Sequence, residues 1–178
     1  MRALIDTLRR NRRKSNLLAA AACFAMIGFA LYTQRFDALE PCPLCIFQRV
    51  AIMATGLAFL VAAILPARPV AWGYIASLLT TLTAGSAMGV AGRHVYIQSL
   101  PAGQVPTCGA GLAYMREVFP FMEVLKKVLT GSGECAKVDW TFLGLSMPAW
   151  VLICAVLLCV AGLVVNWPQR DVRGAWRS

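Results

Sequence analysis

The sequence predicts an all-α membrane protein, a four-helix transmembrane bundle, and two observations support this fold class. Of the 178 residues, 59% are hydrophobic and only 14% are charged, and the mean hydropathy is +0.66. A soluble chain of this length is far less apolar. The apolar residues are also gathered in runs long enough to cross the roughly 30 Å hydrocarbon core of a bilayer. Four such runs occur, at 17–33, 46–65, 70–92 and 148–167.

The first run, 17–33, follows a cluster of basic residues and could be a cleavable signal peptide. Its apolar stretch continues to Tyr32, which is longer than the usual signal core of about 7 to 15 residues. Three further apolar runs follow it. We therefore expect this segment to be retained as the first span.

The next two runs are separated by the short turn Pro66 to Pro69, and the second run carries a single charge, Arg49, near its start. In the third run, Gly85 and Gly89 form a small-xxx-small pair, a pattern that permits close contact between membrane helices. We expect that pair to lie at a helix interface. The fourth run, 148–167, completes the bundle, and we treat 1–178 as a single membrane domain.

Basic residues are distributed unevenly between the two sides of the predicted bundle. Four spans place both termini on one side, which holds ten of the 17 Lys and Arg residues against two acidic residues, a net charge of +8. The opposite side holds seven against six, a net charge of +1. The positive-inside rule therefore predicts cytoplasmic termini. The overall charge of +9 reflects this orientation and contact with anionic lipid, and does not indicate a nucleic-acid partner.

The opposite side is predicted to carry a short loop, 34–45, and a long loop, 93–147. Within the long loop, apolar residues recur at helical spacing over 112–129, with charged residues on another face. Such an amphipathic segment between two spans is expected to lie along the bilayer surface. The two loops contain Cys42, Cys45, Cys108 and Cys135, whereas Cys23, Cys154 and Cys159 fall within spans, where we expect them to act as small packing residues.

Cys42 and Cys45 form a CxxC pair directly ahead of an apolar run, so a dithiol is predicted at a helix N-terminus. Unpaired N–H groups and the positive end of the helix dipole favour a thiolate there. Arg49 follows Cys45 by one helical turn, on the same face. A guanidinium inside a span is costly and usually functional, although one this close to the interface can instead extend to the polar surface. We expect it to hold the Cys45 thiolate and to donate a hydrogen bond to the carbonyl of a bound quinone.

Four non-cytoplasmic cysteines could form two structural disulfides, a metal site, or a relay of exchanging disulfides. A structural zinc site favours a second CxxC or a histidine pair, but Cys108 and Cys135 are far apart in the chain and His94 is the only histidine, so we expect no metal. A disulfide across a two-residue spacer stabilises little by chain entropy. Glycine or proline near Cys108 and Cys135 would let these sulfurs change partners, which favours the relay.

Three features of the sequence resemble the disulfide bond formation protein B (DsbB) family over essentially the whole chain. They are Pro41-Cys42-Pro43-Leu44-Cys45 with Arg49, the Cys108 and Cys135 pair, and the segment WTFLGLSMPAW at 140–150. The resemblance implies a multi-pass protein of the bacterial inner membrane with periplasmic loops. Such a protein reoxidises DsbA, a periplasmic thioredoxin-like oxidase, and passes the electrons to ubiquinone or menaquinone.

The resemblance also implies roles for individual residues. Cys108 would be attacked by the carrier, and the released Cys135 would attack Cys42. Cys45 would then face the quinone with assistance from Arg49. His94 matches a histidine near the family's quinone site.

Other interpretations remain open from the sequence. The chain could be a specialised relative that serves one dedicated oxidant. It could resemble a vitamin K epoxide reductase, although the CxxC of such an enzyme would be expected on the last helix of the bundle. A non-enzymatic membrane protein that binds metal is the alternative from a different class.

Overall fold

The computed structural model describes most of the chain, and the statements below concern only that part. It covers residues 2–36, 41–66, 69–101, 120, 122–123, 128, 133–138 and 140–168. Its elements are α1 (Arg2–Arg10), α2 (Arg12–Phe36), α3 (Pro43–Ile64), α4 (Val70–Gln98), α7 (Gly133–Ala136), β1 (Thr141–Phe142), β2 (Leu145–Ser146) and α8 (Met147–Asn166).

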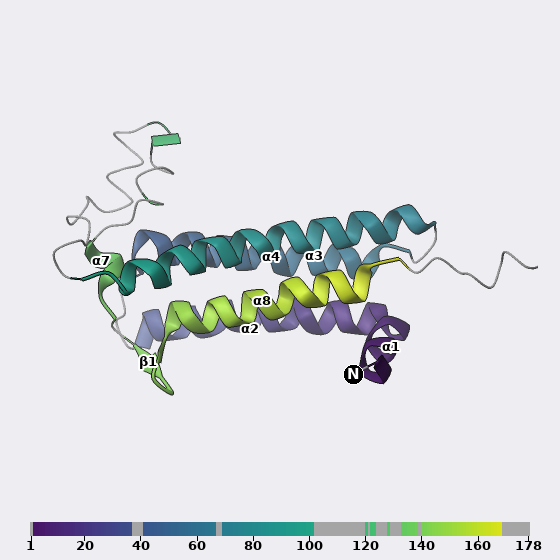
Figure 1. The fold of residues 1–178 in the computed structure, drawn as a ribbon, viewed down its shortest axis with the longest axis horizontal. Coiled ribbons are helices and arrows are strands. Elements are labelled where there is room, and N and C mark those ends of the chain that lie inside the picture. Colours follow the sequence, from purple (N-terminus) through teal and green to yellow (C-terminus); the bar gives the residue numbers. More distant parts are fainter. Residues whose placement is uncertain are drawn as a thin grey trace, which may run out of the picture.

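The four long helices α2, α3, α4 and α8 lie side by side as a bundle (Figure 1). Each is long and apolar enough to cross a membrane. Helix α4 packs against α3 and α8, and α2 packs against the same two helices from the other side. The predicted four-helix membrane fold is confirmed. Helix α1, which the sequence analysis did not predict, lies across the end of the bundle at the start of α2.

The helices extend beyond the predicted spans. Helix α2 runs from Arg12 to Phe36, and α4 continues past Gly92 to Gln98. An apolar run marks only the part of a helix that faces hydrocarbon, whereas the backbone can remain helical into the interface, where polar side chains are solvated. His94 is therefore helical and does not belong to a loop. The surface helix predicted over 112–129 falls almost entirely outside the described residues.

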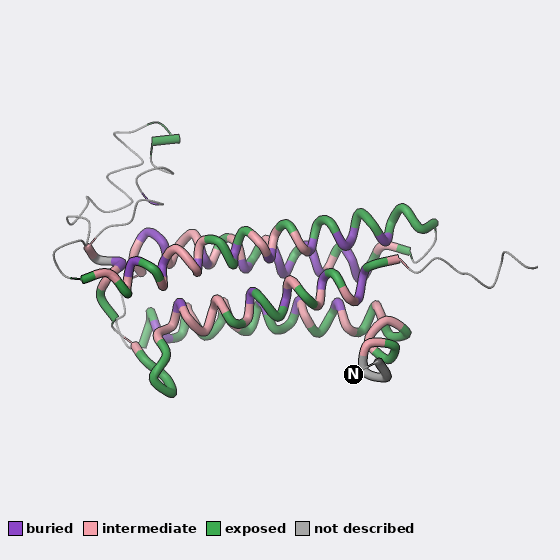
Figure 2. The backbone as a smooth tube through the Cα atoms, viewed as in Figure 1, coloured by how far each residue is buried: buried purple, intermediate pink, exposed green. Residues whose placement is uncertain are grey.

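Small side chains make up most of the bundle core. One cluster of buried residues joins all four long helices and includes Ala20, Cys23, Phe59, Ala84 and Ala155. Buried positions follow one face of each long helix, while the outward faces stay exposed (Figure 2). In a bilayer those outward faces would meet lipid. Small residues at the interface let the backbones approach closely.

The prediction that Gly85 and Gly89 form a helix contact is wrong. A methyl group added at either position would meet no atom within 4 Å. Helix α4 buries a different face, which carries Ala84, Ala87 and Ala91. Because α4 has small residues on more than one face, spacing alone does not identify the packed one.

The close contact between α4 and α8 is made by Gly162 against Thr80. A methyl group at Gly162 would lie 2.7 Å from Oγ1 and 3.1 Å from Cβ of Thr80. Thr80 is fully buried, and its hydroxyl donates to the carbonyl oxygen of Ala76 at 2.8 Å. The threonine therefore has little freedom to move away, and the glycine is required at this crossing.

We expect Gly162→Ala to destabilise the bundle by about 1 to 3 kcal/mol, the usual cost of overpacking a core. The thermal unfolding midpoint of the detergent-solubilised protein measures the change. Gly89→Ala is the matched control, because its methyl group meets no atom within 4 Å and alanine is the better helix former. Equal midpoints for the two variants would contradict the assigned contact.

A polar cluster ties the first and last membrane helices together at the end where α1 lies. Asn16 and Asn166 are both buried, and each amide nitrogen donates to the other's side-chain oxygen at 3.0 Å. Arg12 Nε also donates to Asn166 Oδ1 at 3.0 Å, and Arg9 Nε donates to the carbonyl oxygen of Val164 at 2.8 Å. These bonds satisfy polar groups that would be costly to bury alone.

At the other end of the bundle, a short hairpin leads into α8. Strands β1 and β2 pair antiparallel, and the two turn residues, Leu143 and Gly144, have φ of 51° and 78°. Two consecutive positive φ values are typical of a type I′ hairpin turn. Pro148 occupies the first turn of α8, and Trp150 Nε1 donates to the carbonyl oxygen of Phe142 at 3.0 Å. The hairpin, the proline and the tryptophan together fix the start of α8.

Candidate functional site

Cys42 is the N-cap of α3, as the sequence predicted. Its backbone is extended, with φ −64° and ψ 163°, and its sulfur accepts a hydrogen bond from the backbone N–H of Cys45 at 3.3 Å. Pro43 fits the next position because the first N–H groups of a helix have no partner within it. The Sγ atoms of Cys42 and Cys45 are 3.1 Å apart. A small movement would bring them to disulfide distance, about 2.05 Å.

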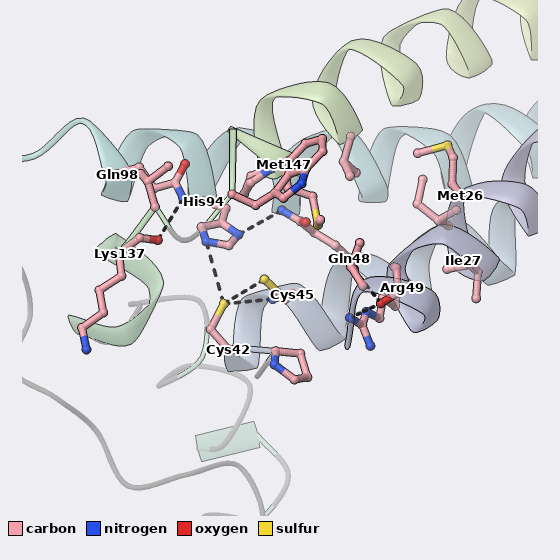
Figure 3. A pocket seen from close by; sticks show the side chains of 18 residues that line it. Met26, Ile27, Cys42, Cys45, Gln48, Arg49, His94, Gln98, Lys137 and Met147 are labelled. Carbon is pink, nitrogen blue, oxygen red and sulfur yellow. Dashed lines mark hydrogen bonds between the residues drawn. The ribbon is translucent and has the colours of Figure 1, made fainter. Parts of the chain in front are cut away.

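His94 reaches the dithiol from α4 and is almost fully buried. Its Nε2 lies 3.8 Å from Cys42 Sγ, and its Nδ1 lies 3.2 Å from Nε2 of Gln48 (Figure 3). The Nε2 atom also lies 3.1 Å from the carbonyl oxygen of Cys135. A carbonyl oxygen can only accept. The Nε2 atom therefore carries the proton and donates to Cys135, and Nδ1 accepts a hydrogen bond from the Gln48 amide. His94 thus connects three elements: the start of α3, α4 and the short helix α7.

Cys135 belongs to the same end of the bundle. It lies in α7 and is only 1% exposed, in a buried cluster with Leu44, Ile97 and Val128. Cys42 packs against this cluster. Three of the four cysteines singled out from the sequence therefore come together, and the fourth, Cys108, falls outside the described residues.

Arg49 makes its hydrogen bonds to α2 and not to Cys45. Its guanidinium donates to the side-chain oxygen of Gln34 and, through Nη2, to the carbonyl oxygen of Ala30 at 3.1 Å. Both acceptors belong to α2, and between Arg49 and Cys45 the structure gives no hydrogen bond. Helical spacing places the two residues on one face, but a long side chain follows the nearest acceptors. The side chain points along the cavity wall toward α2 (Figure 3).

A cavity of about 350 Å³ opens beside the dithiol between α2, α3, α4 and α8. Its volume is in the range of small-molecule sites, which combine apolar walls with a few convergent polar groups. The apolar walls include Met26, Ile27, Ile52, Met147 and Val151, and the polar lining includes Cys42, Cys45, Gln48, Arg49, His94, Gln98 and Lys137. The cavity therefore brings every described site candidate except Cys135 to one surface.

Gln48 is the residue that sequence reasoning missed. It is buried and holds His94 from the side opposite the dithiol. Its position three residues after Cys45 is the only signal in the sequence, because it places a polar side chain in the first turns of an apolar helix. Its partner is 46 residues away along the chain, so the interaction itself could not be read from spacing.

Comparisons with known proteins identify the family of this chain. The family model described as "Disulfide bond formation protein DsbB" matches residues 12–165. Three relatives named "Disulfide bond formation protein B" come from Methylococcus capsulatus, Nitrosococcus oceani and Chromobacterium violaceum. The Methylococcus protein is 50% identical over 152 residues, which cover 85% of this chain and 92% of the relative. The Nitrosococcus protein is 49% identical over 153 residues, which cover 85% of this chain and 88% of the relative. The Chromobacterium protein is 52% identical over 144 residues, which cover 79% of this chain and 84% of the relative.

Proposed function

This chain belongs to the DsbB family of membrane proteins for disulfide bond formation, and from that premise we propose the following activity. The protein oxidises a periplasmic thioredoxin-like dithiol carrier, DsbA, and delivers the electrons to a membrane quinone, either ubiquinone or menaquinone. The observation that carries the proposal is the Cys42 and Cys45 dithiol at the wall of a cavity between membrane-spanning helices. A water-soluble carrier and a lipid-soluble acceptor can both be served from that position.

The proposed location is the bacterial inner membrane, with both termini in the cytoplasm. The charge difference between the two sides, +8 against +1, supports this orientation. In this orientation the dithiol would lie at the periplasmic face, where disulfides persist. Reporter fusions at Gly103 and Ala67 should give opposite signals, and the same signal from both would contradict the orientation.

The cavity suits a quinone head group. Its apolar walls match an isoprenoid compound that arrives from the bilayer, and two polar side chains, Arg49 and His94, line it alongside Cys45. A bound quinone would accept two electrons and two protons. Arg49 is held by α2 through two hydrogen bonds, so its remaining N–H groups can be presented to a carbonyl oxygen without a large reorganisation.

The proposed exchange begins at Cys108. A carrier thiolate attacks its sulfur, the Cys108 to Cys135 bond breaks, and Cys135 leaves as a thiolate. Cys135 then attacks Cys42, the Cys42 to Cys45 bond breaks, and Cys45 leaves as the thiolate that lines the cavity. The packing of Cys42 against the cluster that contains Cys135 supports this second step, because both sulfurs belong to one buried region.

Two further exchanges complete the cycle. The second carrier thiolate attacks the mixed disulfide, so the carrier leaves oxidised and Cys108 is released. Cys108 attacks Cys135 and restores their bond, which leaves Cys42 and Cys45 as a dithiol. A bound quinone would supply the acceptor for their two electrons and two protons, and Cys42 and Cys45 would re-form their disulfide. The hydrogen bond from His94 to the Cys135 carbonyl would hold α7 beside the dithiol during these steps.

The test is an anaerobic titration of reduced carrier with the purified protein and each quinone, following thiol loss and quinol formation together. One quinol for each carrier oxidised supports the proposal. Carrier oxidation without quinol formation would refute it. A panel of thioredoxin-like carriers in the same assay separates a general oxidase from a specialised relative that serves one oxidant.

Arg49→Ala should raise the KM for quinone and lower kcat/KM by about 10- to 100-fold, the usual effect of losing a charged donor at a reacting oxygen. The KM for the carrier should stay unchanged. Arg49→Lys should recover only part of the loss, because an ammonium lacks the planar fork of donors. An unchanged dependence of rate on quinone in Arg49→Ala would leave Arg49 as a helix anchor only.

A further inference from the structure

We propose that the reduced dithiol and His94 together form a binding site for a soft divalent cation such as Zn²⁺, and that the bound cation stops disulfide exchange. Sγ of Cys42, Sγ of Cys45 and a ring nitrogen of His94 all lie within 4.8 Å of one another. The site itself depends only on these three donors, whereas the block of disulfide exchange rests on the proposed function.

The spacing of the donors is close to that of a tetrahedral zinc site. Zinc binds thiolate sulfur at about 2.3 Å and imidazole nitrogen at about 2.0 to 2.1 Å, so two sulfurs on one ion lie about 3.8 Å apart and sulfur and nitrogen about 3.6 Å. The two sulfurs here are 3.1 Å apart, and Cys42 Sγ is 3.8 Å from His94 Nε2. Opening the thiol pair by a fraction of an ångström would bring the two sulfurs to the spacing of zinc ligands, and the third pair of donors, Cys45 Sγ and the His94 nitrogen, lies within 4.8 Å.

Coordination by His94 requires its other tautomer. The Nε2 atom would give up its proton and its bond to the Cys135 carbonyl, and Nδ1 would then carry a proton. Gln48 lies 3.2 Å from Nδ1, and by turning its amide it can present an oxygen to that N–H. Zinc-bound histidines usually donate their other N–H to such an acceptor, which fixes the ring. Gln48 is thus already placed as the second partner of the ligand.

Both thiols must be present for the site to exist. Arg49 and Lys137 line the same cavity, so a cation would be repelled unless two thiolates balance its charge. Binding converts two thiols and one Zn²⁺ into a neutral zinc dithiolate and releases two protons, with no change in oxidation state. In the oxidised protein the Cys42 to Cys45 bond removes both ligands.

The consequence is a block that acts only in the reduced half of the catalytic cycle. With metal bound, Cys42 and Cys45 cannot form a disulfide, so the pair cannot pass on electrons. His94 would also release Cys135, which loosens the attachment of α7. Metal binding would in addition protect the reduced pair from irreversible oxidation, because the thiolates are already engaged.

The experiment uses full-length protein in detergent with Cys108→Ser and Cys135→Ser, so that the only loop thiols are those of the site. The protein is reduced, freed of reductant and titrated anaerobically with Co²⁺ and then Zn²⁺. We expect one ion per chain, with the thiolate charge-transfer band and the intense visible bands of tetrahedral cobalt, which Zn²⁺ removes. Protein with an oxidised Cys42 to Cys45 pair should bind no metal at this site.

Matched variants assign the ligands. His94→Ala should weaken binding at least about tenfold and change the visible cobalt bands, and Gln48→Leu should weaken it by about 10- to 100-fold, as expected for loss of a partner that orients a ligand. Cys159→Ser is the control, since this cysteine packs against the core of the bundle. Unchanged affinity and spectra in His94→Ala, or equal binding by oxidised protein, would overturn the proposed site.

A parallel assay of quinol formation with unsubstituted protein keeps the two proposals distinguishable. Zn²⁺ should inhibit turnover, and chelation should restore it. Absence of turnover before any metal is added contradicts the proposed function alone. Normal turnover that saturating Zn²⁺ leaves unchanged contradicts the metal block alone.

Discussion

Cys45→Ser is expected to abolish sustained quinol formation, with a loss of about 10³-fold or more, as for removal of other essential nucleophiles. In the proposed cycle this sulfur is the leaving thiolate of the second exchange and the group beside the quinone. Cys42 alone cannot form the disulfide that releases two electrons. The variant should still oxidise one equivalent of carrier through Cys108 and Cys135 and then stop.

Rapid mixing of reduced carrier with the variant, followed by alkylation of thiols and by quinol absorbance, measures both parts of this result. Cys159→Ser is the matched control, because it also exchanges a thiol for a hydroxyl in a membrane helix but does not line the cavity. Continued turnover in Cys45→Ser would show that electrons reach the quinone from another group.

Cys135→Ser and Cys108→Ser should differ completely in their capture of the carrier. The probe is a carrier that lacks its resolving cysteine and whose reactive thiol is activated as a mixed disulfide. Cys135→Ser leaves the Cys108 thiol unpaired and removes the thiol that would resolve the complex, so a covalent complex should accumulate. In Cys108→Ser the remaining thiol, Cys135, is only 1% exposed, which closes it to a protein-sized partner.

Non-reducing gels and mass spectrometry of the linked peptides identify the captured cysteine. Serine at Cys23, Cys154 or Cys159 should leave capture and turnover unchanged, since these residues lie within membrane helices. A carrier attached mainly to Cys42 or Cys45 would show that the roles of the two pairs are reversed.

Sequence reasoning finds the four spans because the thickness of a bilayer imposes a length on each apolar run. It does not find the helix ends, since Arg93 and His94 extend α4 without adding to its hydrophobicity. It also misplaces the contact on α4, where a methyl group at Gly85 or Gly89 would meet no neighbouring helix within 4 Å and Thr80 meets Gly162. Which face is buried depends on the neighbouring helices, and small residues occupy several faces of α4.

The sequence predicts those parts of the candidate site whose residues are neighbours along the chain. Cys42 and Cys45 form a motif within one helical turn, and the helix that follows them is visible as an apolar run. The partners of Arg49 and His94 are not predictable in this way. Arg49 reaches Gln34 on α2, and Gln48 meets His94 across 46 residues, because those contacts depend on how the helices pack.

The paired amides of Asn16 and Asn166 also constrain the order in which the chain can assemble. These residues are 150 positions apart, so the first span is made long before its partner exists. Until α8 is inserted, the Asn16 amide lacks the group that satisfies it where it is buried in the finished bundle, and burying it without that partner would be unfavourable. The pair therefore links the burial of Asn16 to the insertion of α8. The stabilisation from this pair is available only after the last helix has been inserted. A truncated product that lacks α8 would leave Asn16 without its hydrogen-bond partner.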